Sequence, residues 1–189
     1  MIDKYYIRMG IVGLFCLLLC SCRIFTPATN PTITVAKIPD TVPIFLYNHP
    51  DIKSTFKHNA IFAYQKGDEI LIVIPTAKYF YPNSAHFCTK RNKALDAIVT
   101  LLNNYQLVDI KVAGYTNNLG SPLRNMALSR ERAQAFTDYL WQHCLNARIM
   151  YATGYGDFDP IANNTSSAGE DLNNRIEISL RLPPANFVW

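Results

Sequence analysis

Hydrophobic residues recur with a period of two in several short stretches of the chain, which is typical of β-strands. Residues 69–75 (EILIVIP) form an apolar run rich in β-branched side chains, so we expect a buried strand there. Residues 108–114 and 176–182 alternate apolar and polar side chains, which predicts two half-buried strands. A further strand is expected at 148–153, followed by a polar loop at 154–164.

In two other segments, apolar residues recur at the spacing of an α-helix. Within residues 90–104, four apolar side chains recur at i, i+3, i+4 and i+7: Leu95, Ile98, Val99 and Leu102. A second apolar series runs to residue 143, and Ser121 and Pro122 suit the N-cap and the first position of that helix. The order strand, helix, strand, helix, strand, strand predicts an α/β (α+β) fold, with a mixed sheet and helices packed on one face.

The N-terminus has the features of an export signal. Lys4 and Arg8 precede an uninterrupted apolar run at 11–19, and small residues follow it. A membrane-spanning helix needs roughly 20 apolar residues, so this run is too short to span a bilayer. The tetrad Leu-Cys-Ser-Cys at 19–22 resembles the bacterial lipobox, although Cys20 stands where a small or β-branched residue is usual. We therefore expect a lipoprotein signal peptide at 1–22, with the lipid on Cys22.

The alternative is an ordinary signal peptide whose cysteines only fill apolar positions. Two or more acyl chains would anchor the protein firmly to a membrane. The resemblance to bacterial lipoproteins also implies that Arg23, where an acid would retain the protein, is compatible with export to the outer membrane. We expect a lipid-anchored outer-membrane protein whose domain faces the periplasm.

Prolines interrupt residues 23–58 repeatedly, at Pro27, Pro31, Pro39, Pro43 and Pro50. Proline at this density disfavours regular helix and favours extended backbone, so we predict a Pro-rich linker or arm. The apolar group at 44–47 leaves open that the arm docks on the domain or on a partner. The folded domain is expected at 59–183, and a C-terminal tail at 184–189.

Charge and residue spacing exclude several function classes. The 189-residue chain has a formal net charge of +4, and its basic residues are scattered, so we expect no nucleic-acid partner. His49, His58 and His86 lack metal-ligand spacing, so we expect no metal and no cofactor. His143 and Cys144 are adjacent, but neighbours on a helix do not face each other, so we expect no catalytic residue and no enzyme.

Cys88 and Cys144 are the cysteines outside the signal segment. An exported protein meets oxidising conditions, so one prediction is a Cys88–Cys144 disulfide. The other is two buried free thiols, because the sequence does not fix the distance between the two residues.

Five motifs occur in order between about residues 61 and 182. They are Phe80 with Asn-Ser-Ala at 83–85, Gly-Tyr-Thr-Asn-Asn-Leu-Gly at 114–120, Asn-Met-Ala-Leu-Ser-Arg-Glu-Arg-Ala at 125–133, Gly-Tyr-Gly at 154–156 and Asn-Asn-Arg-Ile-Glu-Ile at 173–178. Together they resemble the OmpA-like domain, whose turn reads Gly-His-Thr-Asp-Asn-Thr-Gly and whose helix reads Asn-x-x-Leu-Ser-x-x-Arg-Ala. The resemblance implies the OmpA-like fold for this region.

The resemblance also implies binding of peptidoglycan. Members of the family recognise the diaminopimelate side chain of the stem peptide, which carries an ammonium and a carboxylate on one carbon. An acid and an arginine suit this zwitterion, because charge-assisted hydrogen bonds supply both energy and orientation. The family uses an Asp of the turn and an Arg of the helix, which correspond to Asn117 and Arg132. The candidate ligand-binding residues are Thr116, Asn117, Asn125, Arg132 and, as a lesser candidate, Asn83.

Asn117 departs from the family pattern, because it offers a carbonyl oxygen to an ammonium but no charge. A hydrogen bond to a charged group is worth about 1.5–3 kcal/mol and a neutral one about 0.5–1.5, so we expect affinity to fall roughly tenfold. Tyr81 stands where the family often has an acid, and Glu170 and Asn174 where it often has arginines. The alternative is that Asn117 only caps the turn and Arg132 only pairs with an acid.

Two functions of different classes follow. The first is a binding module that clamps the outer membrane to peptidoglycan. The second is a degenerate OmpA-like subunit that serves as a structural piece of an envelope assembly and does not bind peptidoglycan. The small lipoprotein layout resembles that of lipoprotein subunits of the Dot/Icm type IVB secretion system, so other secretion-complex proteins are expected partners.

Overall fold

Five strands form one mixed sheet in the computed structural model, which describes residues 42–88, 93–105, 108–143 and 147–182. The described residues all belong to one compact unit, Pro31–Trp189. The strands are β1 (Phe62–Lys66), β2 (Glu69–Pro75), β3 (Val108–Gly114), β4 (Ala147–Gly154) and β5 (Arg175–Arg181). They lie in the order β1-β2-β5-β3-β4, with β3 and β4 parallel and the other neighbours antiparallel. The predicted mixed sheet is confirmed.

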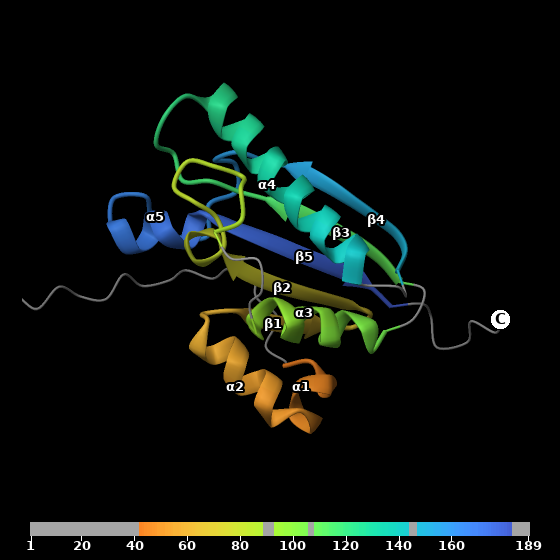
Figure 1. The fold of residues 1–189 in the computed structure, drawn as a ribbon. Helices are drawn as coiled ribbons and strands as arrows, with labels where there is room; N and C mark the ends of the chain where they lie inside the picture. The colour runs from red at the N-terminus through yellow and green to blue at the C-terminus, as the bar shows by residue number, and fades with distance from the viewer. Residues whose placement is uncertain (1–41, 89–92, 106–107, 144–146, 183–189) are drawn as a thin grey trace, which may run out of the picture. The chain divides into compact units, whose positions relative to one another are not determined.

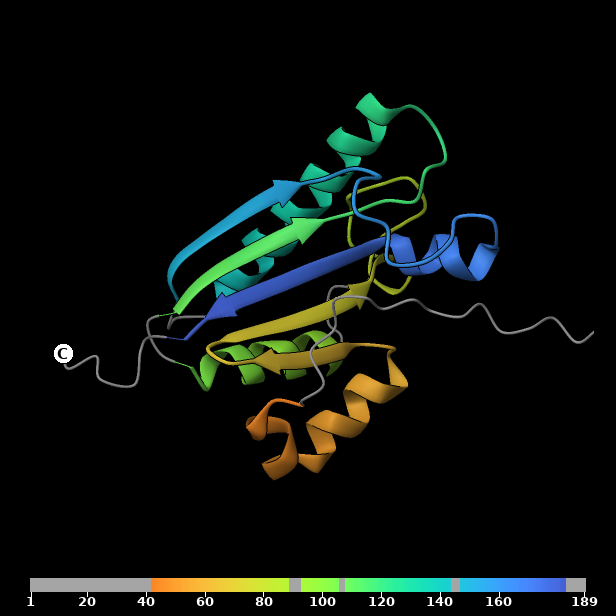
Figure 2. The same cartoon turned by 180° about the vertical axis from the view of Figure 1, so that it is seen from behind.

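The two long helices cover one face of this sheet. α3 (Lys93–Asn103) connects β2 to β3, and α4 (Pro122–His143) connects β3 to β4. Both helices lie in front of the strands in Figure 1 and behind them in Figure 2. The prediction of helices packed on one face is therefore confirmed, and the strands present their other face to the viewer in Figure 2.

The core lies between the sheet and these helices, because alternate side chains of each strand point toward them. Ile72, Ile178 and Val112 are register partners on β2, β5 and β3, and all three are fully buried. The helices contribute fully buried apolar side chains of their own: Leu95, Ile98, Leu101 and Leu102 from α3, and Phe136 and Leu140 from α4. This packing accounts for the apolar periods of the sequence.

Residues 44–58 form two helices where an extended arm was predicted. They are α1 (Ile44–Asn48) and α2 (Pro50–His58), and each buries apolar side chains in the core: Phe45, Leu46, Ile52 and Phe56. Pro43 is the N-cap of α1 and Pro50 is the first residue of α2. Proline is compatible with both places, since its missing N–H has no partner in a first turn. The prediction of extended backbone is therefore wrong for this segment.

β1 and α5 (Ser167–Asn173) were not expected from the sequence. β1 is an edge strand joined to β2 through Gly67, whose φ of +60° is a left-handed conformation that glycine adopts readily. α5 follows the predicted loop and starts at Ser166, whose hydroxyl accepts a hydrogen bond from the backbone nitrogen of Gly169 at 3.1 Å. A short 3-10 helix, η1 (Thr76–Lys78), follows β2.

Within the described ranges, no helix is both long enough and apolar enough to cross a membrane. The predicted signal peptide at 1–22, its Cys22 and the tail at 184–189 lie outside the described residues.

Candidate functional site

Two glycines bring α4 down onto the end of the sheet. Gly114 and Gly154 are register partners at the ends of β3 and β4. A Cβ atom at Gly154 would lie 2.5 Å from the backbone nitrogen of Arg130, and one at Gly114 would overlap the carbonyl group of Ser129. The absence of both side chains therefore lets α4 pack directly on the strand backbone, which fixes its distance from the turn that follows β3.

Hydrogen bonds tie the 114–120 turn to neighbouring segments. The backbone nitrogen of Thr116 donates to the carbonyl oxygen of Gly156 at 2.7 Å. The backbone nitrogen of Asn117 donates to Oδ1 of Asn174 at 3.2 Å. Gly120 has a φ of +93°, which a residue with a side chain rarely adopts. The turn is thus held by the backbone after β4 and by the residue before β5.

α4 starts where the sequence predicted. Pro122 is its first residue, and the hydroxyl of Ser121 accepts a hydrogen bond from the backbone nitrogen of Arg124 at 3.3 Å, as an N-cap does. About two turns into the helix, Ser129 is fully buried and its hydroxyl accepts from the backbone nitrogen of Gly156 at 2.8 Å. These bonds hold the N-terminal half of the helix beside the turn, where Asn125 donates to the carbonyl oxygen of Asn117.

A cavity of about 300 Å³ opens between this turn, α4, α5 and the segment after β2. All five predicted ligand-binding residues line it: Asn83, Thr116, Asn117, Asn125 and Arg132. The structure therefore brings together residues that lie as far as 49 positions apart in the sequence. The site also includes Tyr81, Asp171 and Asn174.

Arg132 is a buried cation without an acidic partner. Its residue is 6% exposed, Nε donates to the carbonyl oxygen of Ser84 at 2.9 Å, and the guanidinium lies over the ring of Phe80 at 5.6 Å. No carboxylate among the described residues forms an ion pair with it. Burial lowers the pKa of Arg132, because the charged form loses its hydration. The alternative in which this arginine only pairs with an acid finds no partner in the described part of the chain.

Thr116 is the second unusual group in the cavity. It is 4% exposed, and its hydroxyl oxygen has no hydrogen-bond partner among the described residues. A buried hydroxyl without a partner costs about 1–3 kcal/mol, so such groups are expected where a ligand supplies the missing bond. Asn125, by contrast, uses its amide nitrogen to donate to the carbonyl oxygen of Asn117 at 3.3 Å.

Asn117 uses its side-chain oxygen within the turn itself. Oδ1 accepts a hydrogen bond from the backbone nitrogen of Leu119 at 3.2 Å, which closes an Asx turn. A backbone N–H can only donate, so this bond fixes which side of the amide is the oxygen. The remaining group, Nδ2, is a donor and is suited to a carboxylate and not to an ammonium.

Two site residues that sequence reasoning missed come from α5 and from the residue that follows it. Asp171 lies on this helix, is exposed, and lines the cavity. Asn174 had been noted only as a departure from the family pattern, yet its side chain bonds to the turn and donates to the carbonyl oxygen of Glu170 at 3.1 Å. A Ser N-cap at 166 with an acid at Glu170 was the available signal for this helix.

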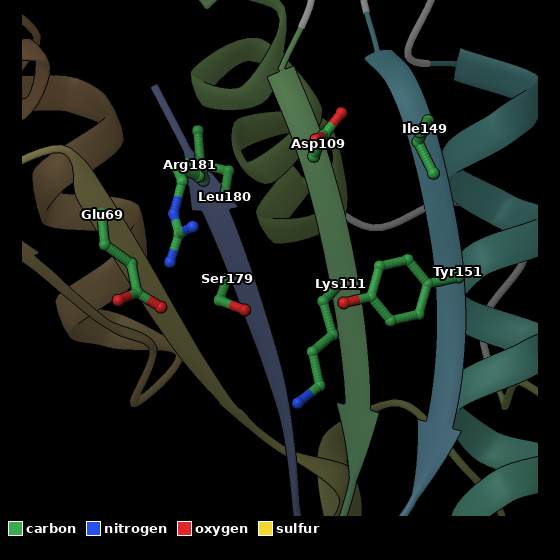
Figure 3. A pocket seen from close by; sticks show the side chains of 8 residues that line it. All are labelled: Glu69, Asp109, Lys111, Ile149, Tyr151, Ser179, Leu180 and Arg181. Atoms are coloured by element: carbon green, nitrogen blue, oxygen red, sulfur yellow. The ribbon is translucent and has the colours of Figure 1, made fainter. Parts of the chain in front are cut away.

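A second cavity, of about 350 Å³, lies on the open face of the sheet (Figure 3). Two of its charged residues have hydrogen-bond partners: Asp109 accepts from Arg148 at 2.8 Å, and Lys111 donates to the hydroxyl of Tyr155 at 2.7 Å. The bond from Arg148 lowers the pKa of the Asp109 carboxyl. None of the charged residues that line it is buried, so this cavity lacks the unpaired buried cation that marks the first one.

Cys88 carries a free thiol in the structure, and its sulfur donates to the carbonyl oxygen of Lys78 at 3.4 Å. Cys144 lies outside the described residues, so the pairing of these two cysteines stays a prediction.

Comparisons with known proteins show what this chain is similar to. The sequence profile of the OmpA family matches residues 79–175, which is just over half of the 189-residue chain. "Probable lipoprotein YiaD" of Escherichia coli (strain K12) is 30% identical over 116 residues, covering 61% of this chain and 53% of YiaD. The chain therefore spans about half the length of this relative.

Two solved structures share the fold. The cell wall anchor of the T6SS from Pseudomonas aeruginosa matches with a TM-score of 0.61 at 26% identity, over 70% of this chain and 94% of that one. The periplasmic domain of Helicobacter pylori MotB matches with a TM-score of 0.60 at 21% identity, over 69% and 84%. The second likeness shows the fold alone, and it confirms the predicted fold class.

Proposed function

Because the chain belongs to the OmpA family, we propose that its domain binds peptidoglycan in the cavity beside the 114–120 turn. The ligand that this cavity suits is the diaminopimelate side chain of the stem peptide, with its carboxylate on the guanidinium of Arg132. The observation that carries the proposal is this arginine, which is buried and has no carboxylate partner among the described residues.

A buried cation without a partner costs several kcal/mol of desolvation, which an anionic ligand in the same cavity would offset. The terminal nitrogens of Arg132 have no acceptor among the described residues, so a carboxylate can take a bidentate bond from them. Thr116 adds a hydroxyl that lacks a partner in the described structure, beside the same cavity. Both groups suit a small polar anion better than a protein side chain packed from outside.

The anchor completes this function. A lipid on Cys22 would hold the domain at the outer membrane, facing the periplasm and the peptidoglycan layer. The relative named probable lipoprotein YiaD, and the T6SS cell wall anchor with the same fold, support an envelope role of this kind. The small lipoprotein layout resembles the DotK/IcmN lipoprotein of the Dot/Icm type IVB secretion system. We therefore propose that the clamp helps anchor an envelope complex, with other secretion-complex proteins as partners.

Co-sedimentation of the full-length protein with purified diaminopimelate-type sacculi, in a mild non-ionic detergent, tests the binding function. We expect the parent protein to sediment with the sacculi and Arg132→Met to lose binding by tenfold or more, since a charge-assisted hydrogen bond is worth about 1.5–3 kcal/mol. Arg124→Met is the matched control, because Arg124 is exposed on the same helix and does not line the cavity. Equal binding by the two variants would contradict the assignment of the site.

Arg132→Met is also expected to stay folded. The substitution removes the hydrogen bond to Ser84, but it also removes the desolvation cost of an unpaired buried charge, and the two effects oppose each other. The midpoint of thermal unfolding should therefore lie within a few °C of the parent, which separates lost binding from lost structure.

The second candidate function is a structural subunit that does not bind peptidoglycan. The Asx turn favours it, because Asn117 commits its side-chain oxygen to Leu119. Asn117→Asp distinguishes the two, since a carboxylate can close the same turn with one oxygen and offer the other to an ammonium. If the parent stays in the supernatant and only Asn117→Asp sediments, the site has lost its ligand and the domain is a scaffold piece.

A further inference from the structure

The cavity beside the 114–120 turn is lined by one basic and one acidic side chain from different elements. Among the lining residues that the structure describes, Arg132 has the only positive side chain and Asp171 the only negative one. The two come from different elements, α4 and α5, and no described residue forms an ion pair with either. The cavity therefore presents one unpaired cation and one unpaired anion to whatever enters it.

The turn does not supply the negative end of this pair. Asn117 is uncharged, its Oδ1 accepts from Leu119, and its backbone oxygen accepts from Asn125. Asn174 is committed in the same way, since its oxygen accepts from the turn and its nitrogen donates to Glu170. An ammonium placed beside Asn117 and Asn174 would meet neutral oxygens that already hold hydrogen bonds.

Asp171, in contrast, lines the cavity with an exposed side chain. No described residue forms a hydrogen bond or an ion pair with its carboxylate. The helix that carries it is fixed at both ends, by the Ser166 cap and by the buried side chain of Asn173. Asn173 accepts from the backbone nitrogens of Ile161 and Ala162 at 2.8 and 3.0 Å. A short helix held in this way presents Asp171 at a defined place, which reduces the entropy cost of binding.

We propose that Asp171 is the acid of the site: its carboxylate receives the ammonium of the zwitterionic ligand while Arg132 receives the carboxylate. This inference rests on the proposed peptidoglycan-binding function and changes how the ligand is recognised. The acid has moved from the turn after β3 to α5. The site thus keeps a charge at each end of the ligand, and Asn117 serves to shape the turn.

Glu170 provides a matched control for this role. It precedes Asp171 on α5 and carries the same charge, but it does not line the cavity, since adjacent helical residues point in different directions. Asp171→Asn and Glu170→Gln therefore make the same change in net charge on the same helix. Only the first removes the charge that faces the ligand.

The test measures binding of full-length protein to diaminopimelate-type sacculi for the parent, Asp171→Asn, Glu170→Gln, and the double variant Asn117→Asp with Asp171→Asn. We expect Asp171→Asn to weaken binding tenfold or more and Glu170→Gln to leave it unchanged. The double variant should recover binding, because an acid returns at the turn. Thermal unfolding of each variant checks the fold, and recovery by the double variant also excludes misfolding as the cause.

Competition identifies the group that Asp171 recognises. Free diaminopimelic acid should displace the parent protein from sacculi at lower concentration than pimelic acid, which has both carboxylates but no ammonium. Asp171→Asn should lose most of this preference, which a purely structural role would not change. Equal binding and equal preference in Asp171→Asn and Glu170→Gln would overturn the inference, while the function itself would stand. Failure of the parent to bind sacculi would overturn both.

Discussion

Substitution of Gly154 by alanine tests whether direct packing of α4 on the strand backbone builds the site. The new Cβ would lie 2.5 Å from the backbone nitrogen of Arg130 and 2.7 Å from its Cα, whereas ordinary contact begins at 3.4 Å. The contact is about 0.9 Å too short, and its partner is helix backbone that cannot rotate away. Gly154 does not have a positive φ, so alanine adds no backbone strain. The effect therefore comes from overpacking alone.

The magnitude follows from this overlap. Overpacking of a tight contact costs about 1–3 kcal/mol, and a backbone contact belongs at the upper end of that range. Alanine also reduces the entropy of the unfolded chain, which offsets about 0.4–1 kcal/mol. The net loss is about 2 kcal/mol, or a fall of about 4–8 °C in the midpoint of thermal unfolding for a protein of this size.

Thermal unfolding followed by circular dichroism measures this loss, with Gly67→Ala as the control. Gly67 has no atom near its missing Cβ but has a φ of +60°, so alanine there adds backbone strain without a steric clash. We expect this control to change stability by about 1 kcal/mol or less, since strain and unfolded-state entropy oppose each other. The displaced helix should also weaken binding to sacculi, because Arg132 lies two residues beyond Arg130. A melting point for Gly154→Ala at or above that of Gly67→Ala would refute the packing argument.

Two further substitutions test the interior. Tyr79→Phe should raise stability by about 1 kcal/mol at pH 7, because the buried Tyr79 hydroxyl has no hydrogen-bond partner among the described residues. Burial raises the pKa of Tyr79 to about 12, so the parent protein should lose stability as the pH rises from about 10 towards 12. Tyr79→Phe should lose less stability over the same range. Unfolding measured at pH 7 and at pH 11 compares the two proteins. Asn173→Ala should lower stability by about 2–4 kcal/mol in denaturant unfolding, because it leaves buried backbone groups unpaired. The control Asn163→Ala changes an exposed side chain and should cost less than about 1 kcal/mol. A stabilising or neutral Asn173→Ala would contradict the role of that side chain in fixing α5.

The sequence predicts those elements in which the spacing of apolar residues alone distinguishes a strand from a helix. β2, β3 and β5 bury alternate side chains against the helices, and α3 and α4 bury a stripe, so the apolar pattern identifies them directly. The end of β3 and the start of α4 could also be placed, because glycines and a serine cap have local conformational roles.

The remaining elements depend on context that spacing does not reveal. α1 and α2 lie among prolines, and the places of Pro43 and Pro50 at helix starts are visible only once the helices are known. α5 has seven residues, and its anchoring depends on Asn173 bonding to a loop about 11 residues earlier. Because the apolar pattern does not predict α5, no sequence feature points to Asp171 as part of the site.

The role of Asn117 also depends on tertiary structure, because its partner is distant in the sequence. The resemblance to the family places an acid at position 117 and often an arginine at position 174, and this chain has asparagine at both. The structure joins the two positions, since the backbone nitrogen of Asn117 donates to Oδ1 of Asn174. At these two positions, one acidic and one basic charge of the family pattern are thus absent together. A turn built from neutral groups needs no counter-charge, so Arg132 and Asp171 remain as the unpaired charges of the cavity. Position 117 alone is therefore a poor guide to the charges of the site, because the carboxylate that lines the same cavity as Arg132 is carried by α5.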